Sequence, residues 1–382
     1  MTSQADKTPG PVAVIGAGVA GAACAAALAQ AGHVVTVFDK ARGPGGRMST
    51  RRGQHLDGQP LAYDHGAQYF TARDAGFQAV VQQGLQAGWI APWALVEAGV
   101  PLPSSAPVDV DPKYVAVPGM PELARQILAG VGQVGARRID TLWPWHVSGL
   151  RPSPEGWCLK SLPPATDAPD APEPPEVWHP QAFSQVVLAM PPEQAAVLLA
   201  PHRADWSEQA RQAPMWPCWT LMLLTDPVAW PFDAMRPSSH QPGHPLGWLA
   251  RNDRKPGRVA HPTLQAWVAQ ATPEWSEAHL ELTPEQVTPL LHQALFDALG
   301  LPAGAHPVVA HSAVQRWRYA QPARGAGAMA PQAPQAPWWD AALGLGVCGD
   351  FLGGGRVEAA WLSGHQLAQT MLLCTNPESR RA

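Results

Sequence analysis

The hydrophobic pattern of residues 12–38 predicts a strand, a helix and a second strand in close succession. Residues 12–15 form an apolar run rich in β-branched side chains, which is typical of a buried parallel strand. Residues 19–31 contain no proline and are dominated by alanine, the strongest helix former, and Gly32 follows as a helix stop. A second apolar run at 34–38 predicts the next strand. This succession is the β-α-β unit on which dinucleotide-binding domains are built.

The turn between the first strand and the helix carries glycines at the G-x-G-x-x-G spacing, namely Gly16, Gly18 and Gly21. In such a turn the first glycine permits the tight bend, the second lets a pyrophosphate approach the backbone, and the third lets the helix pack on the strand. Val19 and Ala20 open the helix, whose free N–H groups and partial positive charge attract anions. Asp39 closes the second strand, where it can accept hydrogen bonds from ribose hydroxyls. The residues therefore predict a dinucleotide site.

A second glycine cluster, residues 43–47, decides which dinucleotide is expected. It would supply further backbone N–H donors, and Arg47 could hold phosphate oxygens in its guanidinium fork. The plain alternative is a glycine turn without a ligand. The string from Asp39 to Met48 resembles the double-glycine-arginine signature of FAD enzymes of the glutathione-reductase-like and amine-oxidase superfamilies, and NAD dehydrogenases lack this second element. The resemblance implies FAD, held non-covalently.

Composition narrows the class of protein further. The chain has 382 residues, enough for two connected domains, and a net charge of −4 gives no basic surface for nucleic acid. Its five cysteines are scattered without metal-like spacing, which predicts a reduced compartment and no metal site. Residues 1–11 contain no apolar signal segment, and no apolar run reaches membrane-spanning length. We therefore expect a soluble cytoplasmic protein without a membrane partner.

The rest of the chain alternates between segments expected in the nucleotide-binding domain and segments expected in a second domain. A helix is expected at 75–87 with Asp74 as its N-cap, a second helix up to about 129, strands within 136–147, and a buried strand at 183–190. Between 196 and 319, strand-like pieces and a helix at 284–299 predict a separate domain on an antiparallel sheet. A strand at 343–348 and a helix at 356–373 return to the first domain. The expected strand-like pieces are 219–225, 246–250, 263–270 and 308–319.

These expectations give a discontinuous domain organisation. The FAD-binding domain is expected to comprise 1–74, 115–195 and 340–382, and the substrate domain 75–114 and 196–339. Residues 161–180 and 320–337 are rich in proline and predict surface loops. Residues 344–349 also match G-x-G-x-x-G, but their glycines fall within a predicted strand, so we interpret this match as chance.

Several strings along nearly the whole chain resemble the bacterial renalases. They run in the same order and comprise residues 45–49, 65–74, 248–252, 316–320, 348–350, 355–358 and 360–364. The resemblance implies an α/β fold, with a Rossmann-like FAD-binding domain of the p-hydroxybenzoate hydroxylase/amine oxidase type. It also implies a second α+β substrate domain on an antiparallel sheet. The implied activity is FAD-dependent oxidation of misreduced nicotinamide dinucleotides, the 2- and 6-dihydro isomers of NAD(P). Hydride would pass to flavin N5, releasing NAD(P)+, and the reduced flavin would then pass two electrons to O2, giving H2O2.

The resemblance also divides the candidate residues by role. Those expected at the cofactor are Gly16, Gly18, Val19, Ala20, Gly21, Asp39, Lys40, Gly46, Arg47, Met48, His65, Gly66, Ala67, Gln68, Tyr69, Gly349, Asp350, Arg356 and Val357. The helix that begins near Arg356 is expected to aim its N-terminus at the N1/O2 edge of the flavin. His65 is placed near the cofactor without a proton-transfer role, because a lone histidine beside a glycine is more often structural. The residues expected on the substrate side are Trp248, Arg251, Asn252 and Tyr319.

Three other functions remain open on the sequence. An amine oxidase or desaturase of the same superfamily would need an aromatic cavity, for which the 17 tryptophans provide material. An NAD(P)H-dependent aromatic hydroxylase is disfavoured because that family's further nucleotide signatures are absent. A non-catalytic FAD-binding redox sensor would show no rapid flavin reduction by a small substrate. The preferred dihydro isomer, NAD versus NADP, and the oligomeric state stay open.

Overall fold

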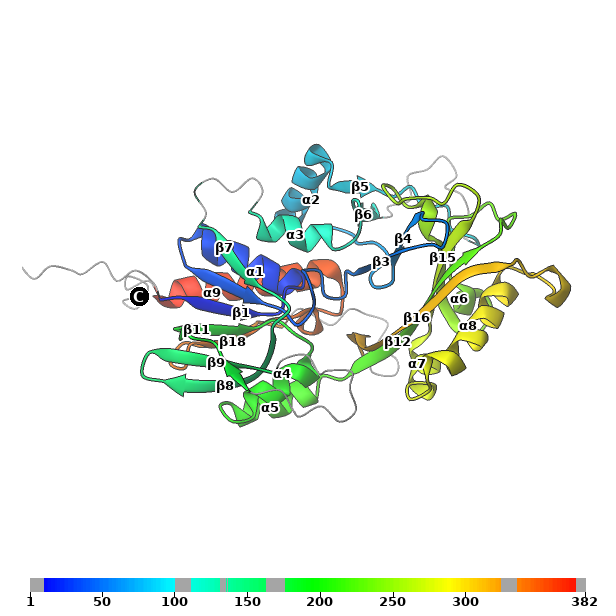
Figure 1. The fold of residues 1–382 in the computed structure, drawn as a ribbon. Coiled ribbons are helices and arrows are strands. Elements are labelled where there is room, and N and C mark those ends of the chain that lie inside the picture. The colour runs from blue at the N-terminus through cyan, green and yellow to red at the C-terminus, as the bar shows by residue number, and fades with distance from the viewer. Residues whose placement is uncertain are drawn as a thin grey trace, which may run out of the picture. The chain divides into compact units, whose positions relative to one another are not determined.

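The computed structural model describes residues 10–99, 111–130, 135, 137–162, 176–323 and 335–375 (Figure 1). Two compact units make up the chain, and each is described by itself. Unit 1 comprises Met1–Gly46, Leu123–Pro214 and Arg324–Ala382, and unit 2 comprises Arg47–Glu122 and Met215–Ala323. Residues 47–74, which the sequence analysis groups with the nucleotide-binding domain, belong to unit 2 in this division because their hairpin packs on the sheet of that unit. The domain boundaries themselves stay a prediction.

Unit 1 is built around a six-stranded sheet in the order β17-β18-β11-β1-β2-β7. Five strands are parallel and β17 (Trp338–Asp340) is antiparallel to its neighbour. The parallel strands are β1 (Val12–Ile15), β2 (Val35–Phe38), β7 (Ile139–Leu142), β11 (Gln185–Leu188) and β18 (Leu345–Val347). Every residue of β1 and β2 is buried, as expected for their largely apolar sequences, which only Thr36 interrupts.

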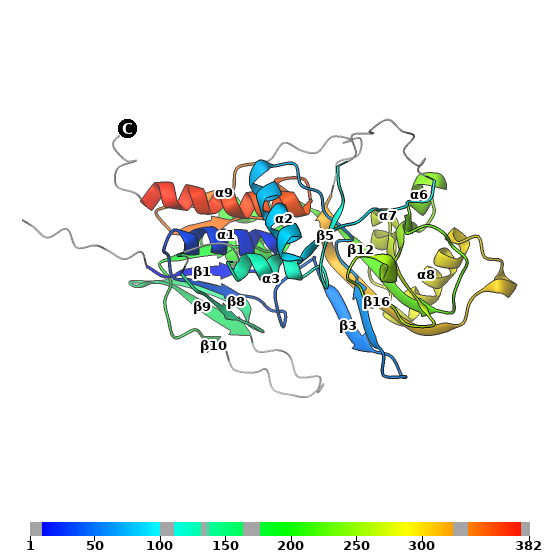
Figure 2. The ribbon, with the colours of Figure 1, turned by 90° about the horizontal axis from the view of Figure 1, so that it is seen from above.

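Both faces of this sheet are covered. Helices α1 (Val19–Gln30) and α9 (Val357–Thr375) pack against each other on one face, and Figure 2 shows a second sheet across the other. That second sheet consists of β8 (His146–Ser153), β9 (Gly156–Leu162) and β10 (Val177–Trp178). Short helices complete the unit, namely α3 (Glu122–Leu128), α4 (Pro192–Leu199) and α5 (Ala204–Arg211).

Unit 2 contains a five-stranded antiparallel sheet in the order β13-β14-β15-β12-β16. Its strands are β13 (Ala234–Met235), β14 (Leu246–Arg251), β15 (Gln265–Ala271), β12 (Met215–Thr225) and β16 (Val309–Pro322). Alternate residues of β12 face opposite sides, so Trp219, Leu221 and Leu223 pack in one core with the helix α8 (Pro284–Ala298). Met222 and Leu224 point to the other face of the sheet, where they belong to a second hydrophobic core.

The hairpin of β3 (Thr50–Gln54) and β4 (Pro60–Asp64) covers that second face through Leu61 and Tyr63. The remaining elements of unit 2 are α2 (Ala75–Ala87), β5 (Ile90–Pro92), β6 (Tyr114–Ala116), α6 (Pro237–His240), α7 (Pro273–Ala278) and the single 3-10 turns at Asn252–Arg254 and Ala303–Ala305. Thus the predicted fold class, a Rossmann-like parallel sheet with a separate antiparallel-sheet domain, is confirmed.

Individual elements follow the sequence closely where local signals are strong. Helix α2 has the predicted bounds, and its N-cap Asp74 accepts hydrogen bonds from the backbone N–H groups of Gly76 and Phe77. The two proline-rich segments differ in part from prediction, because β9 continues to Leu162 and β16 to Pro322. Their central parts, 163–175 and 324–334, lie outside the described residues. None of the helices described is long and apolar enough to span a bilayer.

Candidate functional site

The first glycine turn of unit 1 is held in a conformation that two of its glycines make possible. Gly16 has a φ of +114°, and a Cβ there would lie 2.2 Å from the carbonyl oxygen of Ala189. A Cβ at Gly21 would lie 1.9 Å from the carbonyl oxygen of Gly16, so the helix touches the turn directly. A side chain at Gly16 would therefore collide with the backbone that follows β11, and a side chain at Gly21 would push α1 away from the turn.

Gly18 differs from these two because a side chain at this position would collide with no atom of its own unit. Its φ of −72° suits any residue, and no heavy atom lies within 4 Å of a Cβ built there. The turn therefore leaves open space beside the Gly18 backbone, as expected where a ligand approaches. Gly18 is also the N-cap of α1, with no side-chain cap and no acidic residue in the first turn. The helix N-terminus thus offers uncapped N–H donors and its dipole to an anion.

The second glycine cluster lies directly against the first. The Gly45 N–H donates to the Ala17 carbonyl oxygen at 2.9 Å, and a Cβ at Gly46 would lie 3.3 Å from the Gly18 Cα. Gly45 and Gly46 both have positive φ values, which favour glycine. The structure therefore brings together two glycine loops that the sequence separates by about thirty residues. Their combined backbone could cradle a diphosphate.

Asp39 supports the turn through both carboxylate oxygens. Oδ2 accepts a hydrogen bond from the Ala17 N–H and Oδ1 from the Ala41 N–H, each at 2.7 Å. Each oxygen keeps a lone pair for a further donor, so the predicted ribose contact is compatible with this arrangement and stays a prediction. Lys40 reaches the side-chain oxygen of Gln194 at 3.5 Å.

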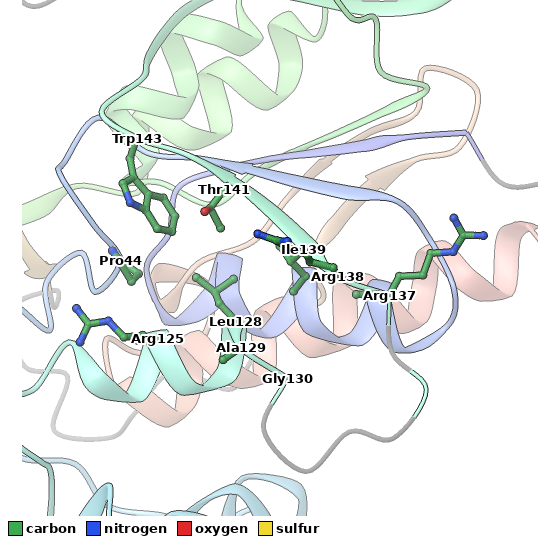
Figure 3. A pocket seen from close by; sticks show the side chains of 11 residues that line it. Pro44, Arg125, Leu128, Ala129, Gly130, Arg137, Arg138, Ile139, Thr141 and Trp143 are labelled. Carbon is green, nitrogen blue, oxygen red and sulfur yellow. The ribbon is translucent and has the colours of Figure 1, made fainter.

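A cavity of about 520 Å³ adjoins the second glycine cluster within unit 1 (Figure 3). Pro44 lies at one end, between Trp143 and Arg125, and Arg137 extends from the other end. Its wall is β7, an edge strand that pairs with β2 alone among the described strands, so backbone groups on its other side have no strand partner. Residues of α1, α3 and β7 complete the lining: Ala29, Leu128, Ala129, Gly130, Arg138, Ile139 and Thr141. Sequence reasoning missed this cavity, because none of its residues belongs to a motif.

The C-terminal residues of unit 1 that are predicted to contact the cofactor lie at a tight turn before α9 and at the start of that helix. The Gly349 N–H donates to the Ser363 hydroxyl at 3.0 Å, and the Asp350 carbonyl oxygen accepts from the N–H groups of Gly353 and Gly355. Asp350 is buried within a 3-10 turn, Asp350–Leu352, and Arg356 and Val357 lead into α9. The roles predicted for these residues at the flavin stay predictions.

In unit 2 the predicted flavin-side segment is fixed by a buried charge network. Asp64, fully buried, accepts from Arg258 Nη2 at 2.7 Å and Nε at 2.9 Å and lies 3.3 Å from Lys255 Nζ. Lys255 also donates to the Gln68 side-chain oxygen at 2.8 Å, while Gln68 Nε2 donates to the carbonyl oxygens of Asp64 and Gly66. The two cations hold the pKa of Asp64 below its usual value against the effect of burial, and burial lowers the pKa of Lys255 to about 8. The network fixes the Gln68 side chain in one orientation.

Gly66 and Ala67, between Asp64 and Gln68, pack closely against the backbone of Arg47. A Cβ at Gly66 would lie 1.9 Å from the Arg47 carbonyl oxygen, which accepts from the Ala67 N–H at 2.9 Å. The Arg47 side chain donates to the Ala320 carbonyl oxygen at 3.2 Å, and Met48 is buried.

His65 has the environment of a structural residue. Its ring stacks on Trp317 with centroids 5.1 Å apart, and its Nε2 lies 3.0 Å from the Ser49 hydroxyl. Burial, with a contribution from Arg51, lowers the pKa of His65 to about 4, so the ring is neutral at physiological pH. A buried, neutral and stacked ring fits a structural role, and the predicted position of His65 near the cofactor stays a prediction.

Two cations of unit 2 lie near the ring of Tyr69, which is predicted to contact the cofactor, and the ring of Trp248, which is predicted to lie on the substrate side. The Tyr69 and Trp248 rings lie 5.7 Å apart, and the Arg236 guanidinium is 4.7 Å from the Trp248 ring centroid. Arg236 also donates to the Tyr69 hydroxyl at 2.9 Å and pairs with Glu97 at 2.9 Å. Lys113 Nζ is 5.7 Å from the Tyr69 ring centroid. We call Tyr69, Trp248, Arg236 and Lys113 the aromatic–cation cluster. Arg236 and Lys113 carry no motif and were missed in the sequence.

The other predicted substrate-side residues have partners within unit 2. Arg251 forms a two-point ion pair with Asp253 at 2.8 and 2.9 Å, and Asn252, fully buried, donates to the Ala62 carbonyl oxygen and accepts from the Asp64 N–H. Tyr319 lies on β16, partly buried. The Asn252 bonds connect the segment after β14 to β4, and the Arg251 ion pair fixes the turn that follows β14. The contact of either residue with a substrate stays a prediction.

Comparison with known proteins agrees with this architecture. A family model described as an NAD(P)-binding Rossmann-like domain matches residues 14–83, which include both glycine clusters and Asp39. Among solved structures, cyclohexylamine oxidase from Brevibacterium oxydans IH-35A aligns with a TM-score of 0.61 at 14% identity, covering 95% of this chain and 98% of that one. The chain has the amine-oxidase fold. Wild-type putrescine oxidase bound to putrescine aligns with a TM-score of 0.60 at 14% identity over 95% of this chain and 99% of the other. At this identity the likeness is one of fold.

Proposed function

We propose that unit 1 binds FAD non-covalently, with the diphosphate at the two glycine loops. The open space at Gly18, the uncapped N-terminus of α1 and the positive-φ glycines beside it support this placement. The cavity at β7 would take the adenosine part, because the outer edge of β7 pairs with no other described strand and can offer backbone hydrogen bonds, and Trp143 offers a ring face. This placement predicts that the protein binds FAD far more tightly than FMN, which lacks the adenosine. Equal affinities would contradict the use of this cavity.

The reaction that we propose is oxidation of the 2- and 6-dihydro isomers of NAD(P) to NAD(P)+. FAD would supply the hydride acceptor, and O2 would take up the two electrons to give H2O2. The protein has to hold a dinucleotide against the flavin and exclude competing acceptors, since hydride transfer depends mainly on alignment. Gln68, fixed by Lys255, and Tyr69, fixed by Arg236, provide rigid side chains for such alignment.

The aromatic–cation cluster is the observation that favours a dihydronicotinamide dinucleotide over an amine as the substrate. An ammonium substrate is best held over aromatic faces or beside a free carboxylate. In unit 2 the faces of Trp248 and Tyr69 already hold Arg236 and Lys113, and the nearby Glu97 is paired with Arg236. An incoming ammonium would be repelled by these cations. The diphosphate of a dinucleotide would be attracted by them, and its nicotinamide ring can stack on the aromatic side chains.

The second candidate is an amine oxidase or desaturase, which the amine-oxidase fold favours. A non-catalytic FAD-binding redox sensor is the third. All three share the cofactor site, so the substrate side has to discriminate among them.

Steady-state oxygen uptake with a substrate panel tests the proposal. The purified protein, reconstituted with FAD, is mixed with 2-dihydro-NAD(P), 6-dihydro-NAD(P), ordinary NAD(P)H and a set of primary amines. We expect peroxide formation with one or both dihydro isomers and at most slow turnover with NAD(P)H or amines. Turnover with amines alone would replace the proposal by the second candidate, and no turnover with any compound would favour the redox sensor.

A further inference from the structure

A cluster of two histidines and one aspartate lies in unit 2, apart from every candidate residue discussed above. His55 and Asp57 stand at the turn of the β3–β4 hairpin, and His261 precedes β15. One ligand atom from each residue lies within 4.8 Å of the other two. Some 200 residues of chain separate His261 from the other two, so this meeting is created by the fold. The site has the composition of a three-residue zinc centre with one open position.

The distances between the three candidate ligand atoms are close to those around a bound metal ion. Asp57 Oδ2 is 2.8 Å from His261 Nε2, and Asp57 Oδ1 is 2.9 Å from His55 Nδ1. Ligand atoms around a tetrahedral zinc ion are about 3.4 Å apart, given metal–ligand bonds of about 2.1 Å. Since the observed separations range from 2.8 to no more than 4.8 Å, small side-chain rotations would bring all three atoms to that spacing.

His55 shows that the cluster is not satisfied by hydrogen bonds alone. Its Nδ1 is buried and has no hydrogen-bond partner among the described residues, although Asp57 Oδ1 lies 2.9 Å away. Unpartnered buried polar atoms are costly, and a cation at the centre of the cluster would satisfy this one. The His261 side chain is 4% exposed and Asp57 44%, so the fourth coordination position would open to solvent on the Asp57 side.

The neighbouring groups hold the ligands in place. Asp57 Oδ1 accepts from the Gln59 N–H at 2.9 Å. His261 Nδ1 accepts from the Leu264 N–H at 3.2 Å, so without metal its proton lies on Nε2 toward Asp57. Metal ligation at Nε2 moves that proton to Nδ1, where the Thr263 hydroxyl, 3.4 Å away, can accept it. The backbone N–H groups of Thr263 and Leu264 would then lose their hydrogen bonds to His261 Nδ1, which are long at 3.3 and 3.2 Å. Thr263 is exposed, so its N–H group can bond to water instead.

We propose that His55, Asp57 and His261 bind a divalent transition-metal ion, zinc by preference, and that this ion clips the β3–β4 hairpin to the loop before β15. Imidazole nitrogens with one carboxylate are a ligand set that zinc accepts readily. The clip would stabilise the hairpin that covers one face of the unit 2 sheet. It needs neither FAD nor substrate and is independent of the proposed oxidase activity.

Metal binding to the full-length protein tests this. The protein is stripped with a chelator and dialysed, and Zn2+ alone is titrated by calorimetry while bound metal is counted by elemental analysis. We expect one zinc per chain and a rise in the unfolding midpoint of about 3 °C at a hundredfold excess over Kd. Co2+ in place of zinc should give the visible d–d absorption of a low-coordinate site without a thiolate charge-transfer band, which separates this site from the five cysteines.

Variants distinguish the site from adventitious binding. Asp57→Asn and His261→Gln should each weaken zinc binding at least tenfold and abolish the Co2+ spectrum. The matched control is His146→Asn, an exposed histidine on β8 of unit 1, which should bind as the wild type does. Zinc binding that is unchanged in Asp57→Asn, or lost equally in His146→Asn, would overturn the proposal. So would a wild-type stoichiometry well below one, or a Co2+ spectrum with a thiolate band.

Discussion

Replacing Gly18 by alanine should separate cofactor binding from folding. The alanine methyl group would meet no heavy atom within 4 Å, and the φ of −72° is normal for alanine. Because glycine-to-alanine changes at compatible angles restrict the unfolded chain, the apoprotein should gain about 0.4–1 kcal/mol of stability. The same methyl group would occupy the space through which a diphosphate approaches the backbone. We expect FAD affinity to fall at least tenfold, which corresponds to about 1.4 kcal/mol.

Two other glycines serve as controls for this experiment. Gly16→Ala should lower apoprotein stability by about 1–2 kcal/mol from the left-handed backbone alone, with a further loss from the 2.2 Å approach to Ala189. Gly53→Ala, on β3 with open space around it, should raise apoprotein stability by an amount similar to that of Gly18→Ala, about 0.4–1 kcal/mol, and should leave FAD affinity at the wild-type value.

The assay is denaturant unfolding of each apoprotein, followed by thermal unfolding with increasing FAD. At an FAD concentration of a hundred times the wild-type Kd, the cofactor should stabilise the wild type by about 2.7 kcal/mol and Gly18→Ala by about half as much. A Gly18→Ala protein that binds FAD as well as the wild type does would refute the placement of the diphosphate at this turn. An apoprotein that is unfolded by the change would refute the claim that the space there is empty.

Three further predictions concern unit 2. Asp64→Asn leaves two buried cations without their carboxylate and should cost about 3–5 kcal/mol in urea unfolding, whereas Glu281→Gln, in a solvent-exposed ion pair, should leave the unfolding free energy nearly unchanged. Similar costs for both would contradict the network. Because His65 has a pKa of about 4 when folded and about 6.5 when unfolded, its contribution is complete above pH 6.5 and is lost as the pH falls toward 4. The unfolding free energy of His65→Asn should therefore vary less over that window, and equal slopes would exclude the assignment. Arg236→Gln should raise KM for a dihydronicotinamide substrate at least tenfold, about 1.4 kcal/mol, with little change in flavin absorbance. An unchanged KM would remove this residue from the substrate side.

The nucleotide-binding half of the fold is visible in the sequence because its signals are local. Strand β1, the glycine turn, α1 and β2 follow one another without interruption, and each has a strong composition of its own. Helix α2 was equally accessible, since Asp74 marks its start and Gly88, in the left-handed conformation, its end. The apolar face of β12 likewise predicts a strand.

The elements that sequence reasoning missed have weak or long-range signals. Strand β3 is mostly exposed and polar, so it has no hydrophobic alternation, and it is a strand because β4 pairs with it. The partners of Asp64 stand 191 and 194 residues away, a distance over which a single sequence shows no pairing. The cavity beside β7 depends on which strand ends the sheet, a property of topology.

The same limit applies to the substrate side. Trp248, Arg251 and Asn252 stand together in one string, but the structure gives them different surroundings. Trp248 belongs to the aromatic–cation cluster, whereas Arg251 forms an ion pair with Asp253 and Asn252 bonds to the backbone of β4. The sequence shows that these residues are neighbours along β14 and the turn after it, but it cannot show which side chains or backbone groups each of them contacts.

The proposed oxidation of dihydronicotinamide isomers is tested most directly by an anaerobic titration of the FAD-loaded protein. One equivalent of 6-dihydro-NAD or 2-dihydro-NAD should bleach the flavin completely within the mixing time of a stopped-flow instrument or shortly after, and release one equivalent of NAD+. Admission of air should restore the yellow colour and give one equivalent of H2O2. Flavin that stays oxidised with both isomers and their phosphorylated forms but bleaches with an amine would contradict the account.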